Sequence, residues 1–311
     1  MSRRFGLARP LHLLLVLWLI SLGSFALFAM APGDPAEIIL RDRHEAPRLE
    51  QIQALRSQMG LDRAWPVRYG LWLGRVAQGD LGHSWRSGET VVTEIARRLP
   101  ATLELALASL VVVLVLSSLA GSLAALRQGR ALDWGIRAWT VVLISLPNYW
   151  LGLLLIYFLS LKAHWLPVMG RGGLEHLVLP CLTLGASVAM LQGRVLRATL
   201  LQIMGMDYIR FAHAKGMRPA AVFWRHMFKN ALPPLVTMWG VSLGQLLGGA
   251  MIVETIFAWP GLGQLTVTAV LGRDVPVVQG IVLLVATAFV LINLAVDWIN
   301  RRLDPRMGSH V

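Results

Sequence analysis

The sequence has little cysteine and little charge, and each shortage excludes a class of protein. Its 311 residues include one cysteine, Cys181, so neither a disulfide within the chain nor a cysteine-based metal site can form. Charged residues make up 15% of the chain, whereas soluble domains carry about a quarter. Hydrophobic residues make up 56%. This composition excludes an ordinary soluble domain and indicates a membrane protein, in which Cys181 is a small buried apolar residue.

Motifs for ATP hydrolysis and zinc catalysis are also missing. A phosphate-binding loop needs Gly-Lys followed by Ser or Thr, yet the three lysines, Lys162, Lys215 and Lys229, precede alanine, glycine and asparagine. The zinc-protease pattern H-E-x-x-H does not occur either. The chain therefore has no ATPase motif of its own, and we expect it not to be an enzyme.

Hydrophobic runs alternate with short charged connections, and six of these runs approach or exceed the length of a membrane span. The core of a bilayer requires about 20 apolar residues per helix. The runs are Leu11–Ala31, Ala101–Leu126, Ala138–Leu161, Leu177–Gln192, Pro234–Phe257 and Val277–Ile299. The fourth is the least regular, because Arg194 and Arg197 interrupt its extension toward Leu201. We therefore predict an all-α membrane protein with six transmembrane helices.

The first run also has features of a secretory signal. Arginines precede it, and Ala29-Met30-Ala31 resembles a cleavage site. The apolar core of a signal peptide is about 7–15 residues long, however, and this run is longer. Its length favours an anchor that stays in the mature protein.

The net charge of +12 is distributed unevenly along the chain. If the N-terminus is cytoplasmic, the connections on that side carry many arginines and few acidic residues, whereas the long connection 32–100 is nearly balanced. This asymmetry follows the positive-inside rule. We predict that both termini are cytoplasmic and that 32–100 is periplasmic. The basic residues then face a lipid bilayer, and no nucleic acid is needed to explain them.

The predicted periplasmic segment 32–100 contains three amphipathic stretches. Residues 47–60 have apolar side chains at helical spacing and end at a glycine, and residues 66–80 open with a proline. Residues 89–99 form the third stretch. A chain of this length makes a marginal core alone, so we expect a helical cap. The predicted organisation is an N-terminal tail and first helix (1–31), the periplasmic segment (32–100) and a five-helix core (101–311).

Segment 205–232 is basic and amphipathic, and it connects the fourth and fifth predicted spans. Residues 207–215 and 218–232 are typical of two short helices joined by a turn at Gly216, and Pro233-Pro234 marks an end. A helix lying on anionic lipid would have this character. A docking element for a protein partner would have it equally.

The amino-acid sequence of that segment, "DYIRFAHAKGM…RHMFKNALPPLVT", resembles the cytoplasmic coupling loop of ABC-importer permeases. Further stretches are similar to the dipeptide, oligopeptide and nickel group of that family, in the same order along the chain. They include "APGDP", "GDLGHS", "LPATLELAL", "LPNYWLGLLL", "VETIFAWPGLGQL" and "LDPR". The resemblance implies that the coupling loop is formed by Arg210, Ala212, Ala214, Lys215, Gly216, His226 and Asn230. Arg210 departs from the family's usual acidic residue at the first position of the loop signature.

The same resemblance implies a set of partners in a bacterial inner membrane. They are a homologous second permease subunit, two ATP-binding cassette subunits and an extracytoplasmic solute-binding protein. ATP and Mg²⁺ would be bound by the ATPase subunits, and no cofactor by this chain. Closure of the ATPases on ATP would push the coupling loops and open the pathway outward, and hydrolysis would reset it.

Polar residues within or next to the spans are candidates for the transport pathway, because ionisable groups in a membrane are costly to keep. Glu104 and Glu254 would place negative charge at the outer mouth, although each can instead face solvent or cap a helix near the interface. Glu104 also suits the dipole of a first helical turn. Asn148 follows Pro147 and either lines the pathway or satisfies a kink.

The loop "LPVMGRGGLEH" bears on the transported solute. It looks closer to nickel permeases than to dipeptide permeases, and His164 and His176 flank Met169. Met169 is a further pathway candidate, because methionine suits soft metal ions, although a methionine at such a position more often serves packing. We therefore expect nickel or a nickel chelate, with di- or oligopeptides as the alternative. No metal ligands are assigned. An ion-coupled secondary transporter is less consistent with the sequence, because neither inverted repeats nor midplane charges are evident.

Overall fold

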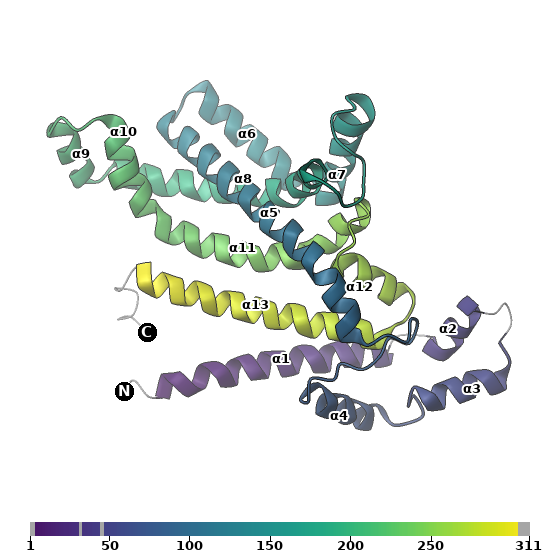
Figure 1. The fold of residues 1–311 in the computed structure, drawn as a ribbon. Helices are drawn as coiled ribbons and strands as arrows, with labels where there is room; N and C mark the ends of the chain where they lie inside the picture. Colours follow the sequence, from purple (N-terminus) through teal and green to yellow (C-terminus); the bar gives the residue numbers. More distant parts are fainter. Residues whose placement is uncertain (1–3, 31–32, 44–46, 304–311) are drawn as a thin grey trace. The chain divides into compact units, whose positions relative to one another are not determined.

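The structure is a computed structural model, and it describes residues 4–30, 33–43 and 47–303. Helices dominate this part of the chain, and no strand forms in it. The helices gather into two compact units (Figure 1). The first unit combines residues 1–101 with 260–290, and the second combines residues 102–259 with 291–311.

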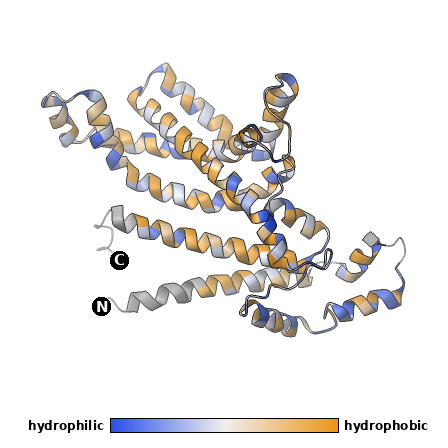
Figure 2. Ribbon diagram, viewed as in Figure 1, coloured by the Kyte–Doolittle hydropathy of each residue, from blue (hydrophilic) through white to orange (hydrophobic). Residues whose placement is uncertain are grey.

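Four uninterrupted helical stretches of the described residues are long and apolar enough to cross a membrane. They are α5 (Val91–Leu126), α8 (Leu174–Met204), the stretch Pro219–Ile256 and α13 (Val275–Leu303). Figure 2 shows apolar residues along most of their length. Two bent pairs of helices raise the number of candidate spans to as many as six. The multi-pass membrane protein expected from the sequence is therefore confirmed, and six is the upper end of the observed range.

The third predicted span, Ala138–Leu161, is not one straight helix. Helix α6 (Ala131–Ser145) ends, and the chain bends by 108° before α7 (Asn148–Leu155) and the π-helical turn η1 (Ile156–Lys162). Leu146 lies at the break with an extended ψ of 127°. The cause is Pro147, because a proline disfavours helical geometry in the residue before it.

The first unit holds α1 (Arg4–Met30), the short helices of the predicted periplasmic segment, α12 (Leu262–Leu271) and the first part of α13. One hydrophobic cluster joins the start of α5 to α12 and α13 through Val91, Ile95, Leu262 and Val277. A second cluster contains three aromatic side chains, Phe25, Tyr69 and Trp72. The Tyr69 hydroxyl lies 2.9 Å from that of Ser21, which ties α4 (Trp65–Val76) to α1.

Two of the three helical stretches expected in 32–100 are confirmed. Helix α3 (Leu49–Gln58) ends just before Gly60, whose φ of +67° explains the glycine, and α4 has proline in its first turn. The third stretch, 89–99, is not separate, because it forms the beginning of α5 and the helix continues through Pro100. Helix α2 (Pro35–Arg43) was not expected from the sequence.

Helix α8 is the centre of the second unit and packs against α6, α7 and α11 (Lys229–Ile256). The close approach of α8 to α5 depends on glycine. A Cβ atom added at Gly121 would lie 2.6 Å from the carbonyl oxygen of Gly193 and 2.8 Å from the Cβ of Leu196. Small residues are the usual contacts between helices in membranes, because they let two backbones come together.

This contact leads to a stability prediction. Gly121→Ala is expected to destabilise the protein by about 1–3 kcal/mol, because the new methyl group overpacks a backbone contact. The measurement is the melting temperature of the purified protein in detergent. Gly135→Ala is the matched control, since nothing lies within 4 Å of a Cβ there. Equal melting temperatures for the two variants would contradict the prediction.

An ion pair joins α6 to α8 inside the second unit. Nε and Nη2 of Arg197 each lie 2.7 Å from a carboxylate oxygen of Asp133, and the Gly129 amide donates to the same carboxylate at 3.0 Å. The Asp133 side chain is 1% exposed. The charge of Arg197 suggested that the fourth span is interrupted there. Instead, α8 continues past Arg197 to Met204.

Candidate functional site

The segment between α8 and α11 is a helical hairpin. Helix α9 (Asp207–Ala214) opens with an acidic residue in its first turn, which suits the helix dipole. Gly216 follows with φ of +75°, a conformation that glycine adopts easily. The chain then returns through α10 (Pro219–Val222) and the π-helical turn η2 (Phe223–Phe228) into α11 (Figure 1). The first predicted short helix and the turn at Gly216 are confirmed, whereas the second predicted helix, 218–232, is the beginning of the long helical stretch Pro219–Ile256.

The end predicted at Pro233-Pro234 is wrong. Helix α11 begins at Lys229 and includes both prolines. A π-helical turn precedes them, and the Thr237 hydroxyl donates to the carbonyl oxygen of Pro233 at 3.2 Å. Local π-type geometry and threonine side chains are ways in which a membrane helix accommodates proline. The hairpin therefore passes directly into a span without a flexible joint.

The base of the hairpin is a hydrophobic cluster shared with the spans. Ile209, Ala212, Val222 and Met227 are buried there. They pack with residues of α5, α8 and α11, namely Ala125, Leu196, Leu200, Ile203, Ala231 and Leu235. Because the hairpin shares this core, a force on α9 reaches the spans through packed side chains.

The residues predicted to form the coupling loop divide between this base and the surface. Arg210, Ala214, Lys215 and Gly216 are exposed. Ala212 is 6% exposed and belongs to the base, so its small size serves packing within the chain. Arg210 pairs with Asp207 at 3.4 Å on the outer side of α9.

The last two predicted loop residues lie on the returning arm of the hairpin. His226 is half-buried in η2. The Asn230 side-chain amide donates to the Tyr208 hydroxyl at 3.0 Å and so connects α11 to α9. Asn230 thus holds the two arms together.

Exposed aromatic residues of the hairpin are a feature that the sequence analysis missed. Phe211 is 61% exposed and Trp224 is 62% exposed. The Lys215 ammonium group lies 4.6 Å from the centre of the Phe211 ring. Large aromatic side chains are enriched at protein interfaces, and a search for aromatic residues off the apolar helix face would have found them.

Of the pathway candidates, Glu254 is fully buried, so it does not face solvent. Its carboxylate accepts a hydrogen bond of 2.7 Å from the Thr102 hydroxyl. Glu104 is partly exposed and pairs with Arg171, whose Nε lies 2.8 Å from the Glu104 carboxylate. The dipole argument for Glu104 is wrong, because α5 begins at Val91 and Glu104 lies well inside it.

Asn148 and Met169 are not brought together. The Ser187 hydroxyl donates to the Asn148 side-chain oxygen at 3.2 Å, beside the bend at Pro147. Met169 is 56% exposed in the loop before α8, where His164 is exposed as well. Among the described residues, no three His, Cys, Asp or Glu side chains are grouped so that they could hold a metal ion.

Residues 240–244 match the pattern G-x-S-x-G of some hydrolases, so our expectation that the chain lacks this motif is wrong. In those enzymes the serine sits on a sharp strand-to-helix turn. Here it lies in the middle of α11, and Ser242 is 3% exposed with Gln192 as its hydrogen-bond partner. The geometry is that of a polar contact between helices.

The second unit packs apolar helices around α8 and anchors a helical hairpin on their common core, as suits a multi-pass membrane subunit. The chain belongs to the family of binding-protein-dependent transport system inner membrane components, whose profile matches residues 117–309. The profile for the N-terminal part of these membrane components matches residues 2–106. The protein is therefore a permease subunit of an ABC importer, a class that works with an ATPase and a binding protein.

Relatives extend over almost the whole chain. The di/tripeptide transport system permease protein DppB of Pseudomonas aeruginosa is 36% identical and covers 98% of this chain and 97% of its own length. The glutathione transport system permease protein GsiC of Escherichia coli K12 is 39% identical, with 97% of each chain covered. The methionine ABC transporter MetNI, in an inward-facing conformation, has the same fold at 23% identity. Its TM-score is 0.60, with 68% of this chain and 97% of the MetNI chain covered.

Proposed function

We propose that the chain forms half of the translocation pathway of an ATP-driven importer for small peptides. The single observation that carries the proposal is the anchored hairpin. It is exposed at α9, packed on a core shared with the spans, and continuous with α11. Such an element transmits movement of a partner into the membrane.

The partner of the hairpin in this proposal is an ATP-binding cassette subunit. Arg210, Ala214, Lys215 and Gly216 form the exposed turn that would enter a cleft of the ATPase. Phe211 and Trp224 would supply apolar contact area beside it. Two such subunits would bind ATP and Mg²⁺, because this chain lacks a phosphate-binding loop. A homologous second permease would complete the pathway.

The proposed topology has six spans, with the hairpin and both termini in the cytoplasm of a bacterium. The bent pairs α1–α2 and α6–α7 would then each contribute one span. The proposed divisions are the N-terminal helix (1–31), a periplasmic segment (32–100) that meets a solute-binding protein, and the core (101–311). The excess of basic residues in the cytoplasmic connections supports this orientation.

The proposed solute is a di- or tripeptide or glutathione, in place of the nickel expected from the loop around Met169. Support comes from relatives named for these peptides that align over nearly the full chain. The structure adds nothing in favour of nickel. Among the described residues, neither His164 nor His176 belongs to a group of side chains that could hold a metal ion near Met169. Glu104, paired with Arg171, and buried Glu254 remain the proposed polar residues of the pathway, together with Asn148.

Uptake in intact cells tests this proposal. A strain lacking the chain, and the same strain with the chain restored, are supplied with labelled dipeptide, labelled glutathione, or labelled nickel with and without histidine. We expect the deletion to abolish uptake of at least one peptide and to leave nickel uptake unchanged. Loss of nickel uptake alone would return the assignment to a nickel chelate. Unchanged uptake of all the solutes would contradict the proposal for peptides.

A further inference from the structure

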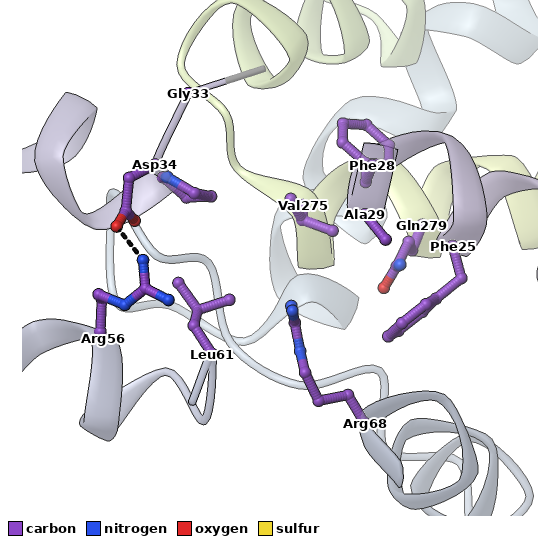
Figure 3. A pocket seen from close by; sticks show the side chains of 11 residues that line it. Phe25, Phe28, Ala29, Gly33, Asp34, Arg56, Leu61, Arg68, Val275 and Gln279 are labelled. Carbon is purple, nitrogen blue, oxygen red and sulfur yellow. Dashed lines mark hydrogen bonds and ion pairs between the residues drawn. The ribbon is translucent and has the colours of Figure 1, made fainter. Parts of the chain in front are cut away.

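The first unit contains a half-open cavity of about 390 Å³ that the proposed function does not use (Figure 3). Phe25 and Phe28 of α1 line it together with Leu61 and Val275, which makes much of its wall apolar. Two arginines, one carboxylate and one carboxamide add polar groups. Ligand sites in proteins commonly have this size and this mixture of apolar walls with a few polar groups.

One of the two arginines is already neutralised. The Asp34 carboxylate accepts a hydrogen bond from Arg56 through one oxygen and from the Ala36 amide, at 3.0 Å, through the other. These contacts raise the pKa of Arg56, chiefly through the side-chain hydrogen bond from Arg56 to Asp34. The Asp34 carboxylate is therefore paired with Arg56, and the two charges balance each other.

The second arginine has no such partner. No carboxylate among the described side chains contacts Arg68, and its guanidinium carbon lies 5.7 Å from the centre of the Phe25 ring. Partial burial, followed by the like charge of Arg56, lowers the pKa of Arg68. A cation that is partly removed from water and lies near another cation gains from any anion that joins it.

A carboxamide in the same wall is also unsatisfied. Gln279 of α13 is 4% exposed, and its side-chain nitrogen has no hydrogen-bond partner within the described residues. Leaving a buried donor unpaired is energetically unfavourable. Figure 3 shows the Arg68 guanidinium and the Gln279 amide both directed into the cavity. Two donors without partners thus converge on one space from α4 and α13.

We propose that this cavity binds a monoanion, a carboxylate or a phosphodiester carried on an apolar body. The guanidinium presents a planar fork that matches two oxygens of such a group. The Gln279 amide would donate a further hydrogen bond, and Phe25 and Phe28 would contact the apolar body. Among the residues that line this cavity, only the charge of Arg68 has no carboxylate partner, which suits a singly charged ligand. The inference holds whatever solute the importer carries.

A binding experiment on the full chain, purified with the subunits that accompany it, tests the proposal. The protein is placed in phosphatidylcholine nanodiscs, and calorimetry measures binding of N-acetylphenylalanine and of its uncharged amide. We expect the acid to bind and the amide to bind at least tenfold more weakly, because the charge-assisted hydrogen bonds are lost. Equal affinity for acid and amide would overturn the proposal.

Variants assign the effect to the two donors. Arg68→Gln is expected to weaken binding of the acid about tenfold or more, Arg68→Lys less, and Gln279→Leu about threefold. Arg41→Gln in α2 removes the same charge from a residue that lines neither this cavity nor the hollow beside it, and it is expected to change nothing. A purely structural role makes the opposite prediction: Gln279→Leu would lower the melting temperature while acid binding by the folded protein stayed the same.

Lipid competition distinguishes the two sources of the anion. Replacing part of the phosphatidylcholine by phosphatidylglycerol offers a phosphodiester at high local concentration. If the natural ligand is a lipid, native mass spectrometry finds phosphatidylglycerol retained by the wild type and lost from Arg68→Gln, and binding of the acid falls. If it is a soluble carboxylate, binding of the acid is unchanged by the lipid. In either case the acid must depend on Arg68, and independence from Arg68 overturns the proposal.

Discussion

Asp133→Ala is expected to remove most of the folded protein from the membrane. The substitution leaves Arg197 in α8 without its carboxylate, and it leaves the Gly129 amide without an acceptor. Breaking a buried ion pair by removing one partner costs about 3–5 kcal/mol, which is a large share of the stability of a typical protein. The measurement is the amount of full-length protein in isolated membranes, together with its melting temperature in detergent.

Two further variants separate the ion pair from general disturbance of α6. Removing both charges, with Asp133→Leu and Arg197→Met, is expected to restore part of the lost stability, because no unpaired charge remains. Asp207→Ala is the matched control, since its pairing with Arg210 is fully on the surface and such pairs contribute about 0–1 kcal/mol. If Asp133→Ala were as abundant as the control, the ion pair would have no structural role.

Gly216→Val is expected to reduce transport more than tenfold while the protein remains folded. Gly216 has φ of +75°, and nothing lies within 4 Å of a Cβ atom there, so valine brings backbone strain and no clash. A branched residue in this conformation costs about 1–3 kcal/mol. The turn can relieve that strain by changing the direction of α9, which we propose to be the element that contacts the ATPase.

The matched variant at the same position is Gly216→Asn. Asparagine adopts positive φ more readily than other residues with a side chain, so this variant is expected to retain most of the uptake. Uptake of the labelled peptide is measured with ATPase activity of the purified complex. If valine and asparagine gave the same uptake, the conformation of the turn would not matter for coupling.

The hairpin shows how far sequence reasoning reaches. Ile209 and Ala212 share one face of α9 by helical spacing, and both prove to be buried. Gly216 was correctly assigned to a turn, because glycine there has a local conformational cause. The contact between Asn230 and Tyr208 was not predictable, since it depends on how the two arms pack. Which of the proposed coupling residues touch a partner stays a prediction.

Prolines account for most of the errors in the fold predicted from the sequence. Pro147 breaks a predicted span, whereas Pro100 and the pair Pro233-Pro234 lie inside continuous helices. The local rule that proline ends a helix is the same at each position. The outcome differs because neighbouring geometry and side chains can satisfy the carbonyls that proline leaves free. The cavity is harder still to predict, because Arg68 and Gln279 are far apart in the sequence.

The length of α5 imposes a condition on the surrounding lipid. Its 36 residues make a rod of about 54 Å, whereas a bilayer with its headgroups is about 40–45 Å thick. The first turns carry Glu94 and Arg97, which pair with Ser87 and Glu89 and belong in water. The apolar remainder from Leu99 to Leu126 is about 42 Å long, longer than the hydrocarbon core of about 30 Å, so it must either tilt or stretch the acyl chains beside it. The protein is therefore matched to a thick bilayer or held at an angle in a thin one, and lipid chain length becomes a variable that acts on its conformation.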